Sequence, residues 1–548
     1  MRLRDLLILT LFLALFFGIL LGSRPLSVPD EGRYVEIPRE MVVSHDWLTP
    51  RLNSVKYFEK PPLFYWIEAM LIRLFGLSEW SVRLGPALLA LFGCLAVFFA
   101  GSRMFGRLTG IFSAIILATS MLYFALSRLI TLDMPVSVLL TAALLSFLAA
   151  TREPAGRTRV LFFRGFYAFA GLAVLTKGLI GIVFPGMIIF SWMLVTGEWR
   201  LLRSMHLLSG SVIFFAIAAP WHILVGRANP EFFDFYFVRE HFQRYLTKVH
   251  HHYKPFWFFI PVVLGGLFPW SAFLVQAVRD ALPATWKDRR QHKETLFLLL
   301  WAALIFLFFS ASSSKLIPYI LPVLPPLALL IGKYLADAVE RGRTGLRAGF
   351  NAFLVMSALI AVVLGALPFR RPDVAPSEIA PYLMIMIAVL ASGAFGAWYL
   401  WKNRRLLPAL AATAATAVLF MTTVSAAVPQ VNAKSNKSLA LEIRKRLGPD
   451  DEIVHYRNYY QDLPVYLERR MTIVDWRGEL DFGMAIENTS GWMIDEAELW
   501  KRWQGPRRIF LAAGTRDADA IRQIPGKLFF LIAQNKNTVI LSNKEDQQ

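Results

Sequence analysis

Several short segments of this 548-residue chain combine carboxylates with cations and tyrosines beside long apolar runs. The first is Pro29-Asp30-Glu31-Gly32-Arg33-Tyr34, which follows an apolar run that ends near residue 22. A carboxylate here can act as a general base, bind a metal ion or orient a cationic group of a substrate. The same Asp–Glu pair is also typical of the first turn of a helix, and the residue types alone favour neither interpretation.

Two further segments place charged side chains next to proline. In Tyr57-Phe58-Glu59-Lys60-Pro61-Pro62 an adjacent acid and base precede a proline pair, which favours an extended backbone. Lys60 could contact a phosphate group, although a lysine that snorkels at a membrane interface has the same surroundings. Asp133 stands at the start of another apolar run, in Thr131-Leu132-Asp133-Met134-Pro135, where it is either a helix cap or a functional carboxylate at membrane depth.

The segment Glu240-His241-Phe242-Gln243-Arg244-Tyr245 is followed by three consecutive histidines at 250–252. Three consecutive side chains cannot all face one ion in regular structure, so the triplet indicates a solvated loop, and His241 is the better candidate metal ligand. A last polar segment, Ser312-Ser313-Ser314-Lys315-Leu316-Ile317-Pro318-Tyr319, joins two apolar runs. Irregular backbone of this kind is tolerated at membrane depth where it lines a cavity.

The elements that must position these segments are membrane-spanning helices. Hydrophobic residues make up 56% of the chain and charged residues 18%, against about a quarter charged in ordinary soluble domains. A bilayer is crossed by about 20 consecutive apolar residues, and about thirteen runs approach that length. We expect spans over residues 6–22, 80–101, 108–126, 132–150, 165–176, 178–197, 206–225, 258–278, 295–311, 316–335, 348–367, 380–400 and 407–427.

The distribution of Lys and Arg predicts the orientation of these spans. With the N-terminus in the cytoplasm, every loop on the cytoplasmic side is basic, as the positive-inside rule requires. The same rule accounts for the net charge of +19 without nucleic acid as a partner. The polar segments then share the outer side, where we expect one cavity suited to a lipid phosphate that carries a polar head. Cys94 is the single cysteine, which excludes an internal disulfide and a cysteine-based metal site.

The predicted fold is therefore a polytopic α-helical membrane protein in two parts. Residues 1–429 form a transmembrane domain with about thirteen helices, an outer loop over 23–79 with an amphipathic helix, and a second outer loop over 226–257. Residues 430–548 contain turn clusters and short β-rich runs separated by helical segments. This pattern predicts a C-terminal α/β domain on the outer face.

Three stretches of the first outer loop, at 30–34, 46–53 and 57–63, resemble the aminoarabinose transferases that modify lipid A, within the protein-mannosyltransferase-like group with the GT-C fold. The stretches at 314–322 and 240–245 are similar to the same family. The resemblance implies an inverting glycosyltransferase of the bacterial inner membrane, with its active site facing the periplasm. Its donor would be a sugar on undecaprenyl phosphate, 4-amino-4-deoxy-L-arabinose foremost, and its acceptor lipid A or another glycolipid or protein.

The resemblance also implies roles for individual side chains. Two carboxylates would be catalytic, namely Asp30 and Asp133. Four side chains would bind the donor phosphate: Lys60, Arg244, Tyr57 and Tyr319. Three would line the substrate cavity: Glu31, Arg33 and Lys315. Two would lie near a divalent metal, Zn or Mg/Mn, namely Glu59 and His241; no organic cofactor is implied.

Two other functions stay open at this point. The stretch Ser127-Arg128-Leu129-Ile130-Thr131-Leu132-Asp133 is closer to the general mannosyltransferase-like members, so a different polyprenyl-phosphate-linked sugar, transferred to protein or to lipopolysaccharide, is an alternative. A flippase or transporter of a lipid-linked sugar is the second alternative. It would place its ionisable residues near the bilayer midplane, whereas these segments gather on one side of the membrane.

Overall fold

A computed structural model describes residues 2–237, 254–342, 345–370, 376–431 and 435–545. The chain forms two compact units. The membrane unit comprises residues 1–21 and 83–430, and the α/β unit comprises residues 22–82 and 431–548. The predicted boundary at 429/430 assigned the first outer loop to the membrane part, whereas the structure groups this loop with the C-terminal residues.

The membrane unit is built from apolar helices, and the described residues contain nine that are long enough to cross a bilayer, or up to ten if one bent pair counts as a span. The nine are α4 (Ser81–Phe105), α7 (Asp133–Arg152), α8 (Arg157–Lys177), α10 (Leu207–Ala228), α14 (Lys293–Ala311), η6 with α15 (Ile317–Arg341), α16 (Arg347–Arg370), α17 (Pro376–Lys402) and α18 (Leu406–Val431). A polytopic helical fold is therefore confirmed, and the count of thirteen is not.

The remaining predicted spans are helical but short or broken. The first is α1 (Leu3–Gly18), and residues 178–197 contain α9 (Ile180–Thr196). The predicted span 108–126 divides into α5 (Arg107–Ala118) and α6 (Met121–Leu126), because the hydroxyls of Thr119 and Ser120 donate to backbone carbonyls four residues earlier and so compete with the helix ladder.

A sharp bend occurs in the predicted span 258–278. There η3 (Phe256–Phe258) and α12 (Phe259–Gly266) meet η4 (Trp270–Phe273) and α13 (Leu274–Ala281) at 106°. The break contains Pro269, which cannot donate a backbone hydrogen bond.

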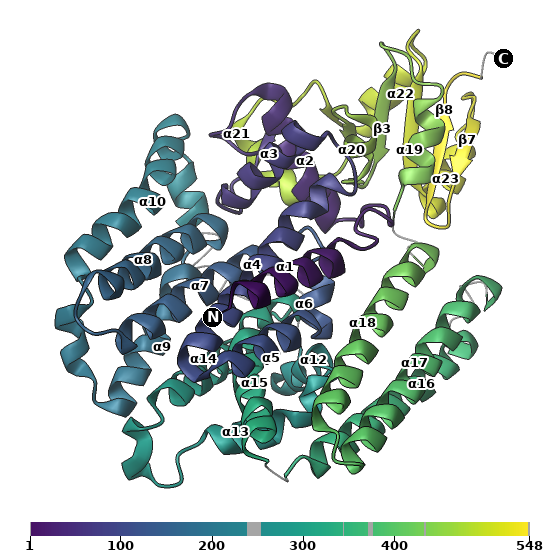
Figure 1. The fold of residues 1–548 in the computed structure, drawn as a ribbon. Helices are drawn as coiled ribbons and strands as arrows, with labels where there is room; N and C mark the ends of the chain where they lie inside the picture. The colour runs from purple at the N-terminus through teal and green to yellow at the C-terminus, as the bar shows by residue number, and fades with distance from the viewer. Residues whose placement is uncertain (1, 238–253, 343–344, 371–375, 432–434, 546–548) are drawn as a thin grey trace. The chain divides into compact units, whose positions relative to one another are not determined.

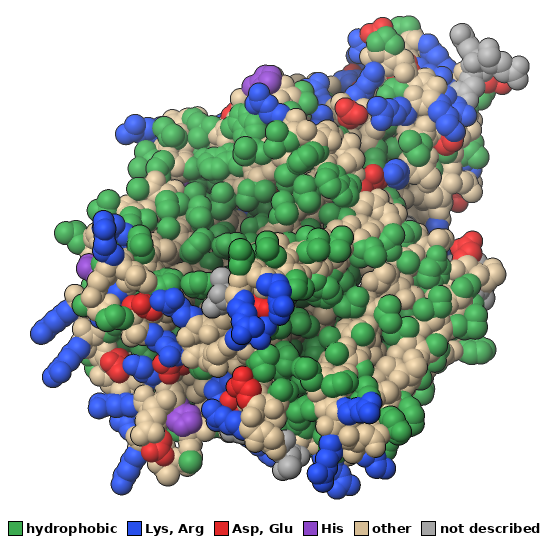
Figure 2. All heavy atoms as spheres, viewed as in Figure 1, with side chains coloured by type: hydrophobic (Ala, Val, Ile, Leu, Met, Phe, Trp, Pro, Cys, Tyr) green, Lys and Arg blue, Asp and Glu red, His purple; other side chains and the backbone are tan. Residues whose placement is uncertain are grey.

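Burial divides the long helices into central and lipid-facing ones. In their most apolar stretches α7 and η6–α15 are each 89% buried, whereas α16 is only 11% buried. α7 packs against α8 and η6, and α15 packs against α5 and α14. Figure 2 shows a broad hydrophobic surface across the middle of this unit, as a lipid-exposed surface requires. Asp133 and Tyr319 therefore stand on the central elements of the bundle.

The α/β unit is organised around a six-stranded sheet in the order β5-β4-β3-β6-β8-β7 (Figure 1). The strands are β3 (Glu452–Tyr456), β4 (Thr472–Val474), β5 (Met493–Ile494), β6 (Ile509–Gly514), β7 (Phe530–Gln534) and β8 (Thr538–Ser542). β5, β4, β3 and β6 are parallel, and β8 runs antiparallel to both β6 and β7. The predicted C-terminal α/β fold is confirmed.

Alternate residues of each strand face two separate hydrophobic cores, as the period of two along a strand dictates. On one face Ile453, Ile473 and Phe510 belong to a core that also holds side chains from α19 (Lys437–Arg444) and α20 (Leu463–Leu467). On the other face Val454 and Leu511 pack with α22 (Glu496–Trp503) and α23 (Thr515–Arg522).

The first face of the sheet also receives the loop that joins α1 to α4. This loop contains α2 (Asp30–Ser44), the short hairpin β1 (Arg51–Leu52) with β2 (Val55–Lys56), and α3 (Leu63–Phe75). Ile37 and Met41 of α2 and Tyr65 and Ala69 of α3 are buried in the same core as Ile453. α2 also packs directly on α20, and the predicted site residues 30–60 are thus held by C-terminal structure (Figure 1).

Candidate active site

A carboxylate, an ammonium and a phenol ring meet at one end of α7 in the membrane unit. Asp133 is the first residue of α7 and Lys177 the last residue of α8, so the antiparallel packing of these helices brings the two side chains together. Lys177 Nζ lies 2.5 Å from Asp133 Oδ1, and the side chains are 18% and 13% exposed. Lys177 Nζ also lies 4.9 Å from the ring centroid of Tyr319. A carboxylate at a helix N-terminus and a cation at a helix C-terminus are each favoured by the helix dipole.

Lys177 is a candidate site residue that was not predicted from the sequence. Its signal is present in the sequence, because Thr176-Lys177-Gly178 interrupts an apolar stretch that otherwise runs from 165 to 197. That interruption was interpreted as the turn between two spans. An ionisable side chain at membrane depth is nevertheless a functional candidate by default, and it usually has a partner.

Lys315 lies in the polar turn between α14 and α15, and Tyr319 lies just after it. Tyr319 lies in η6 (Ile317–Val323), a 3-10 helix that opens after this turn. Lys315 is 4% exposed, and its ammonium donates to the backbone carbonyls of Ser312 and, at 3.1 Å, Lys254. These bonds tie the turn to the chain before α12, so the described contacts of Lys315 stabilise the backbone.

In the α/β unit the two adjacent acids at the start of α2 have different surroundings. Glu31 is 1% exposed, and both of its oxygens accept from the Arg24 guanidinium, at 2.6 and 2.8 Å. Asp30, in contrast, has a side chain that is 62% exposed and lies 3.6 Å from Arg33. The carboxylate of Glu31 thus stabilises the first turn of α2, and that of Asp30 is accessible to a substrate.

Arg33 links Asp30 to the C-terminal part of the chain. Its Nε lies 2.7 Å from Glu479 Oε2, and its side chain is 16% exposed. Burial raises the pKa of the Glu479 carboxyl, while the positive charge of Arg33 opposes that shift. Arg33 therefore lies between a buried carboxylate, Glu479, and an exposed one, Asp30; Asp30 was a predicted site residue, and Glu479 was not.

The Tyr57–Lys60 segment leaves the β1–β2 hairpin beside α2. The backbone N–H of Tyr57 donates to the Pro50 carbonyl at 2.9 Å, and the Tyr57 side chain is 2% exposed. Burial, reinforced by the negative charge of Glu59, raises the pKa of the Tyr57 phenol well above its usual value, so the phenol keeps its proton at neutral pH. Lys60 Nζ donates to the Glu59 carbonyl at 2.8 Å. The segment thus contains a buried phenol and an ammonium, two donor types from which a phosphate accepts hydrogen bonds.

Two of the predicted side chains, His241 and Arg244, lie outside the described residues. Among the described ones, no group of three or more His, Cys, Asp or Glu side chains could hold a metal ion. Glu59 therefore has no complete ligand set within the described part of the chain, and the divalent metal stays a prediction. The shared cavity for Asp30 and Asp133 also stays a prediction.

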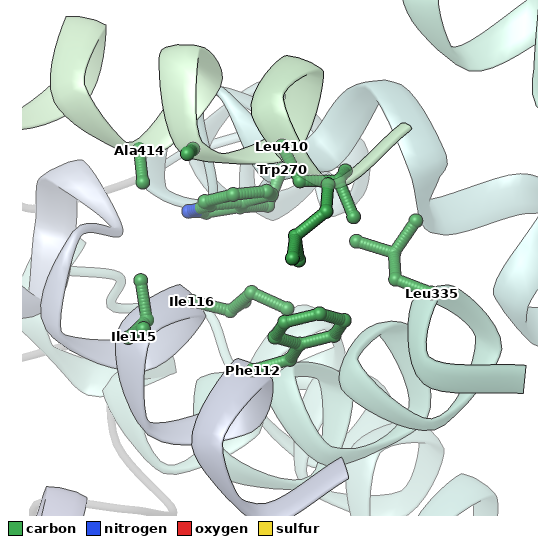
Figure 3. A pocket seen from close by; sticks show the side chains of 9 residues that line it. Phe112, Ile115, Ile116, Trp270, Leu335, Leu410 and Ala414 are labelled. Carbon is green, nitrogen blue, oxygen red and sulfur yellow. The ribbon is translucent and has the colours of Figure 1, made fainter. Parts of the chain in front are cut away.

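A separate pocket of about 180 Å³ lies in the membrane unit, between α5, η4, α15 and α18 (Figure 3). It is lined by Phe112, Ile115, Ile116, Trp270, Leu335, Leu407, Leu410, Ala411 and Ala414. The indole N–H of Trp270 donates to Thr119 Oγ1 at 2.8 Å, so it does not present an unsatisfied donor to the pocket. An apolar lining of this kind suits a hydrocarbon chain and disfavours a sugar or a phosphate.

Family models match two parts of the chain. Residues 59–224 match the model described as dolichyl-phosphate-mannose-protein mannosyltransferase. Residues 439–543 match the aminoarabinose transferase C-terminal domain. The second match covers all six strands of the sheet described above.

Relatives and solved structures extend these matches over the whole chain. A protein of Erwinia tasmaniensis named undecaprenyl phosphate-alpha-4-amino-4-deoxy-L-arabinose arabinosyl transferase is 30% identical over 521 residues, which are 92% of this chain and 91% of the relative. A protein of the same name from Aeromonas salmonicida is 36% identical over 61% of this chain and 60% of its own. The crystal structure of ArnT from Cupriavidus metallidurans bound to undecaprenyl phosphate matches with a TM-score of 0.85 at 30% identity, covering 99% of each chain.

Proposed function

The chain belongs to the undecaprenyl phosphate-alpha-4-amino-4-deoxy-L-arabinose arabinosyl transferase family, and we propose that it has the activity that this name describes. It transfers 4-amino-4-deoxy-L-arabinose from undecaprenyl phosphate to a phosphate of lipid A, on the periplasmic side of the bacterial inner membrane. The observation that carries this proposal is the full-length similarity, joined to the Asp133–Lys177 pair at the start of a buried apolar helix.

The reaction exchanges one phosphate oxygen for another at the anomeric carbon. The bond from this carbon to the donor phosphate breaks, and its electron pair leaves with undecaprenyl phosphate. An oxygen of the acceptor phosphate forms the new bond from the opposite face, which inverts the configuration. Because a phosphate monoester has its second pKa at about 6, the acceptor is largely ionised at neutral pH and needs little help from a general base.

The chain's own residues bind and orient the reactants. Lys60 and Arg244 offset the negative charge that grows on the leaving phosphate, and the O–H groups of Tyr57 and Tyr319 donate to its oxygens. Donors of this kind lower the barrier because their interaction is stronger in the transition state than in the ground state.

The carboxylates contact the sugar and the acceptor. Asp133, oriented by its ion pair with Lys177, binds a polar group of the donor sugar. Asp30 positions the acceptor or contacts the sugar amine; with a hydroxyl acceptor it would instead serve as the general base. A divalent metal at Glu59 and His241 belongs to the same proposal, but no step of the reaction above depends on it.

The test is a transfer assay with the purified protein. Undecaprenyl phosphate carrying the amino sugar, or a neutral hexose, is combined with lipid A, and the products are identified by mass spectrometry. We expect transfer of the amino sugar to a lipid A phosphate. Transfer of the hexose alone supports the alternative of another polyprenyl-phosphate-dependent glycosyltransferase, and movement of the donor across vesicles without any transfer supports a flippase.

The cellular consequence follows from charge. An amino sugar attached to a lipid A phosphate lowers the net negative charge of that phosphate group. Cationic peptides such as polymyxin should then bind the modified lipopolysaccharide less tightly, because the phosphate charge that attracts them is partly neutralised. Expression of the chain in a strain that lacks this activity should raise polymyxin resistance and add the amino sugar to lipid A.

A further inference from the structure

The C-terminal residues hold the two loop segments that carry predicted site residues. Before α2, the backbone N–H of Leu26 donates to the Tyr466 phenol at 2.7 Å. In the β1–β2 turn, the Asn53 side chain makes two hydrogen bonds with the backbone of Met471, at 3.0 and 2.8 Å. Asn53 is 0% exposed, so both bonds are buried. The first loop is therefore folded onto C-terminal structure at both ends of the segment that contains Asp30.

A C-terminal carboxylate, that of Glu487, holds the hairpin that leads to Tyr57 and Lys60. Glu487 accepts from the Arg51 guanidinium and from the backbone N–H of Lys56, both at 2.9 Å. A charge-assisted bond to a backbone N–H fixes the main chain itself, not only a side chain.

The first turn of α2 lies directly against the C-terminal backbone. A β-carbon at Gly32 would lie 2.6 Å from the carbonyl carbon of Gln461 and 2.7 Å from the nitrogen of Asp462. Real contacts of this kind essentially never fall below 3.0 Å, so glycine is needed at this position for close approach. The peptide between Gln461 and Asp462 is therefore the surface against which the helix that presents Asp30 is seated.

One ion pair connects this surface to Asp30. Glu479 lies 2.7 Å from Arg33 through one oxygen, and its other oxygen accepts from the Gln461 side-chain amide at 2.9 Å. Arg33 is also 3.6 Å from Asp30, on the same face of α2 three residues away. Glu479 is thus the closer partner of a guanidinium that Asp30 shares.

We propose that Glu479 is a positioning residue for the transfer reaction, and that the C-terminal domain acts in catalysis by holding Arg33 away from a tight pair with Asp30. This inference rests on the proposed function. With the charge of Glu479 in place, Arg33 orients Asp30 loosely and leaves the Asp30 carboxylate accessible. Without that charge, the guanidinium moves toward Asp30, and the carboxylate is then engaged with Arg33 when it should meet the substrate.

The test measures kcat and KM of the full-length protein in detergent, with Glu479→Gln as the main variant. We expect kcat/KM to fall by about 10- to 100-fold, as displacements of about 1 Å near a reacting group do. In an Asp30→Asn background the same substitution should change the rate by less than about twofold, because residues that act through one another are not additive. A residue with a purely structural role would lower activity by the same factor in both backgrounds.

Two further variants separate positioning from folding. Glu452→Gln is the matched control, since Glu452 is similarly buried at 15% side-chain exposure and pairs with Arg502 of α22 at 2.9 Å. It should leave kcat and KM within about twofold of the wild type, as expected for substitutions away from the site. Gln461→Met removes the amide that holds Glu479 but keeps the charge of Glu479, so it should cause a smaller loss of kcat/KM. It serves as the test variant if Glu479→Gln fails to fold.

The possible outcomes have distinct meanings. A folded Glu479→Gln protein with wild-type kcat and KM overturns the inference, as do losses that multiply with those of Asp30→Asn. If Glu479→Gln does not fold, a Gln461→Met protein with unchanged kcat/KM overturns it as well. A wild-type protein that transfers no sugar overturns the proposed function itself, whereas wild-type transfer of a different sugar leaves the Glu479 test in force with that donor.

Discussion

Replacing Lys177 with methionine tests whether the Asp133–Lys177 pair belongs to the active site. Methionine has a similar length and no charge, so it keeps most of the packing while it removes the cation. The Asp133 carboxylate, which is 13% exposed and 2.5 Å from the ammonium, would then be left without this partner at membrane depth.

The size of the effect follows from the burial of the pair. Two unit charges about 4 Å apart interact by about 4 kcal/mol at an effective dielectric constant of 20. Removing one partner of a buried pair costs about 3 to 5 kcal/mol, and the residual exposure of both side chains places this pair at about 3 kcal/mol. If Asp133 orients the donor sugar, that loss appears in the transition state and lowers kcat/KM by about two orders of magnitude.

The assay combines activity with stability. Transfer is measured with purified protein and defined donor, and thermal unfolding is followed on the same samples. Lys177→Arg keeps the charge and should retain more activity than Lys177→Met. The double variant Asp133→Asn with Lys177→Met leaves no unpaired charge at this position, so it should unfold at a higher temperature than Lys177→Met alone and still have a low kcat/KM. Wild-type kcat/KM in a folded Lys177→Met protein would refute the assignment of this pair to the site.

Three further predictions concern the α/β unit. Asp30→Asn should lower the rate of transfer without lowering the unfolding temperature, because its side chain is exposed. Glu31→Gln should lower the unfolding temperature and leave the rate of transfer nearly unchanged, because Glu31 pairs with Arg24 in the interior. An equal fall of the unfolding temperature in both variants would contradict this division of roles. Gly32→Ala should lower both kcat/KM and the unfolding temperature because its β-carbon has no room, while Gly396→Ala in α17, where nothing lies within 4 Å, should do neither. Burial lowers the pKa of His455 from 6.5 to about 3, so the folded protein holds this imidazole neutral. The free energy of unfolding is therefore undiminished above pH 6.5 and falls as the pH drops toward 3, because the unfolded chain then binds a proton that the folded chain does not. At pH 5 the free energy of unfolding is lower by about 2 kcal/mol. Thermal unfolding at pH 7 and pH 5 should show a smaller acid shift in His455→Gln than in the wild type.

Much of the fold was predictable because hydrophobic length is a local property. The long apolar runs became helices at nearly the expected positions, and the short β-rich runs within residues 430–548 became strands of one sheet. The predicted spans were wrong where side-chain hydroxyls or a proline interrupted the backbone hydrogen bonds of a helix. The hydroxyls of Thr119 and Ser120 divided one predicted span, and Pro269 bent another, so that the described residues contain nine to ten crossings by length.

The candidate site was predictable in part because ionisable residues beside apolar runs are rare. Asp133 was identified in this way and Tyr319 through the family resemblance, and the structure brings both to Lys177. Lys177 itself was overlooked because a single lysine between two apolar stretches looks like a loop residue. Glu479 carries no local signal at all, since a glutamate after glycine in a polar segment has no distinguishing neighbour.

The amino-acid sequence by itself determined that the chain crosses a membrane many times, ends in an α/β domain and carries the motifs of its family, because these properties depend on residues that are close together along the chain. Tertiary structure alone decided which charges meet. Asp133 and Lys177 are 44 residues apart, and Arg33 meets a carboxylate from the far end of the chain. Coulomb interaction depends on distance in space, and only the packing of α7 on α8, and of α2 on the C-terminal sheet domain, brings those charges within contact.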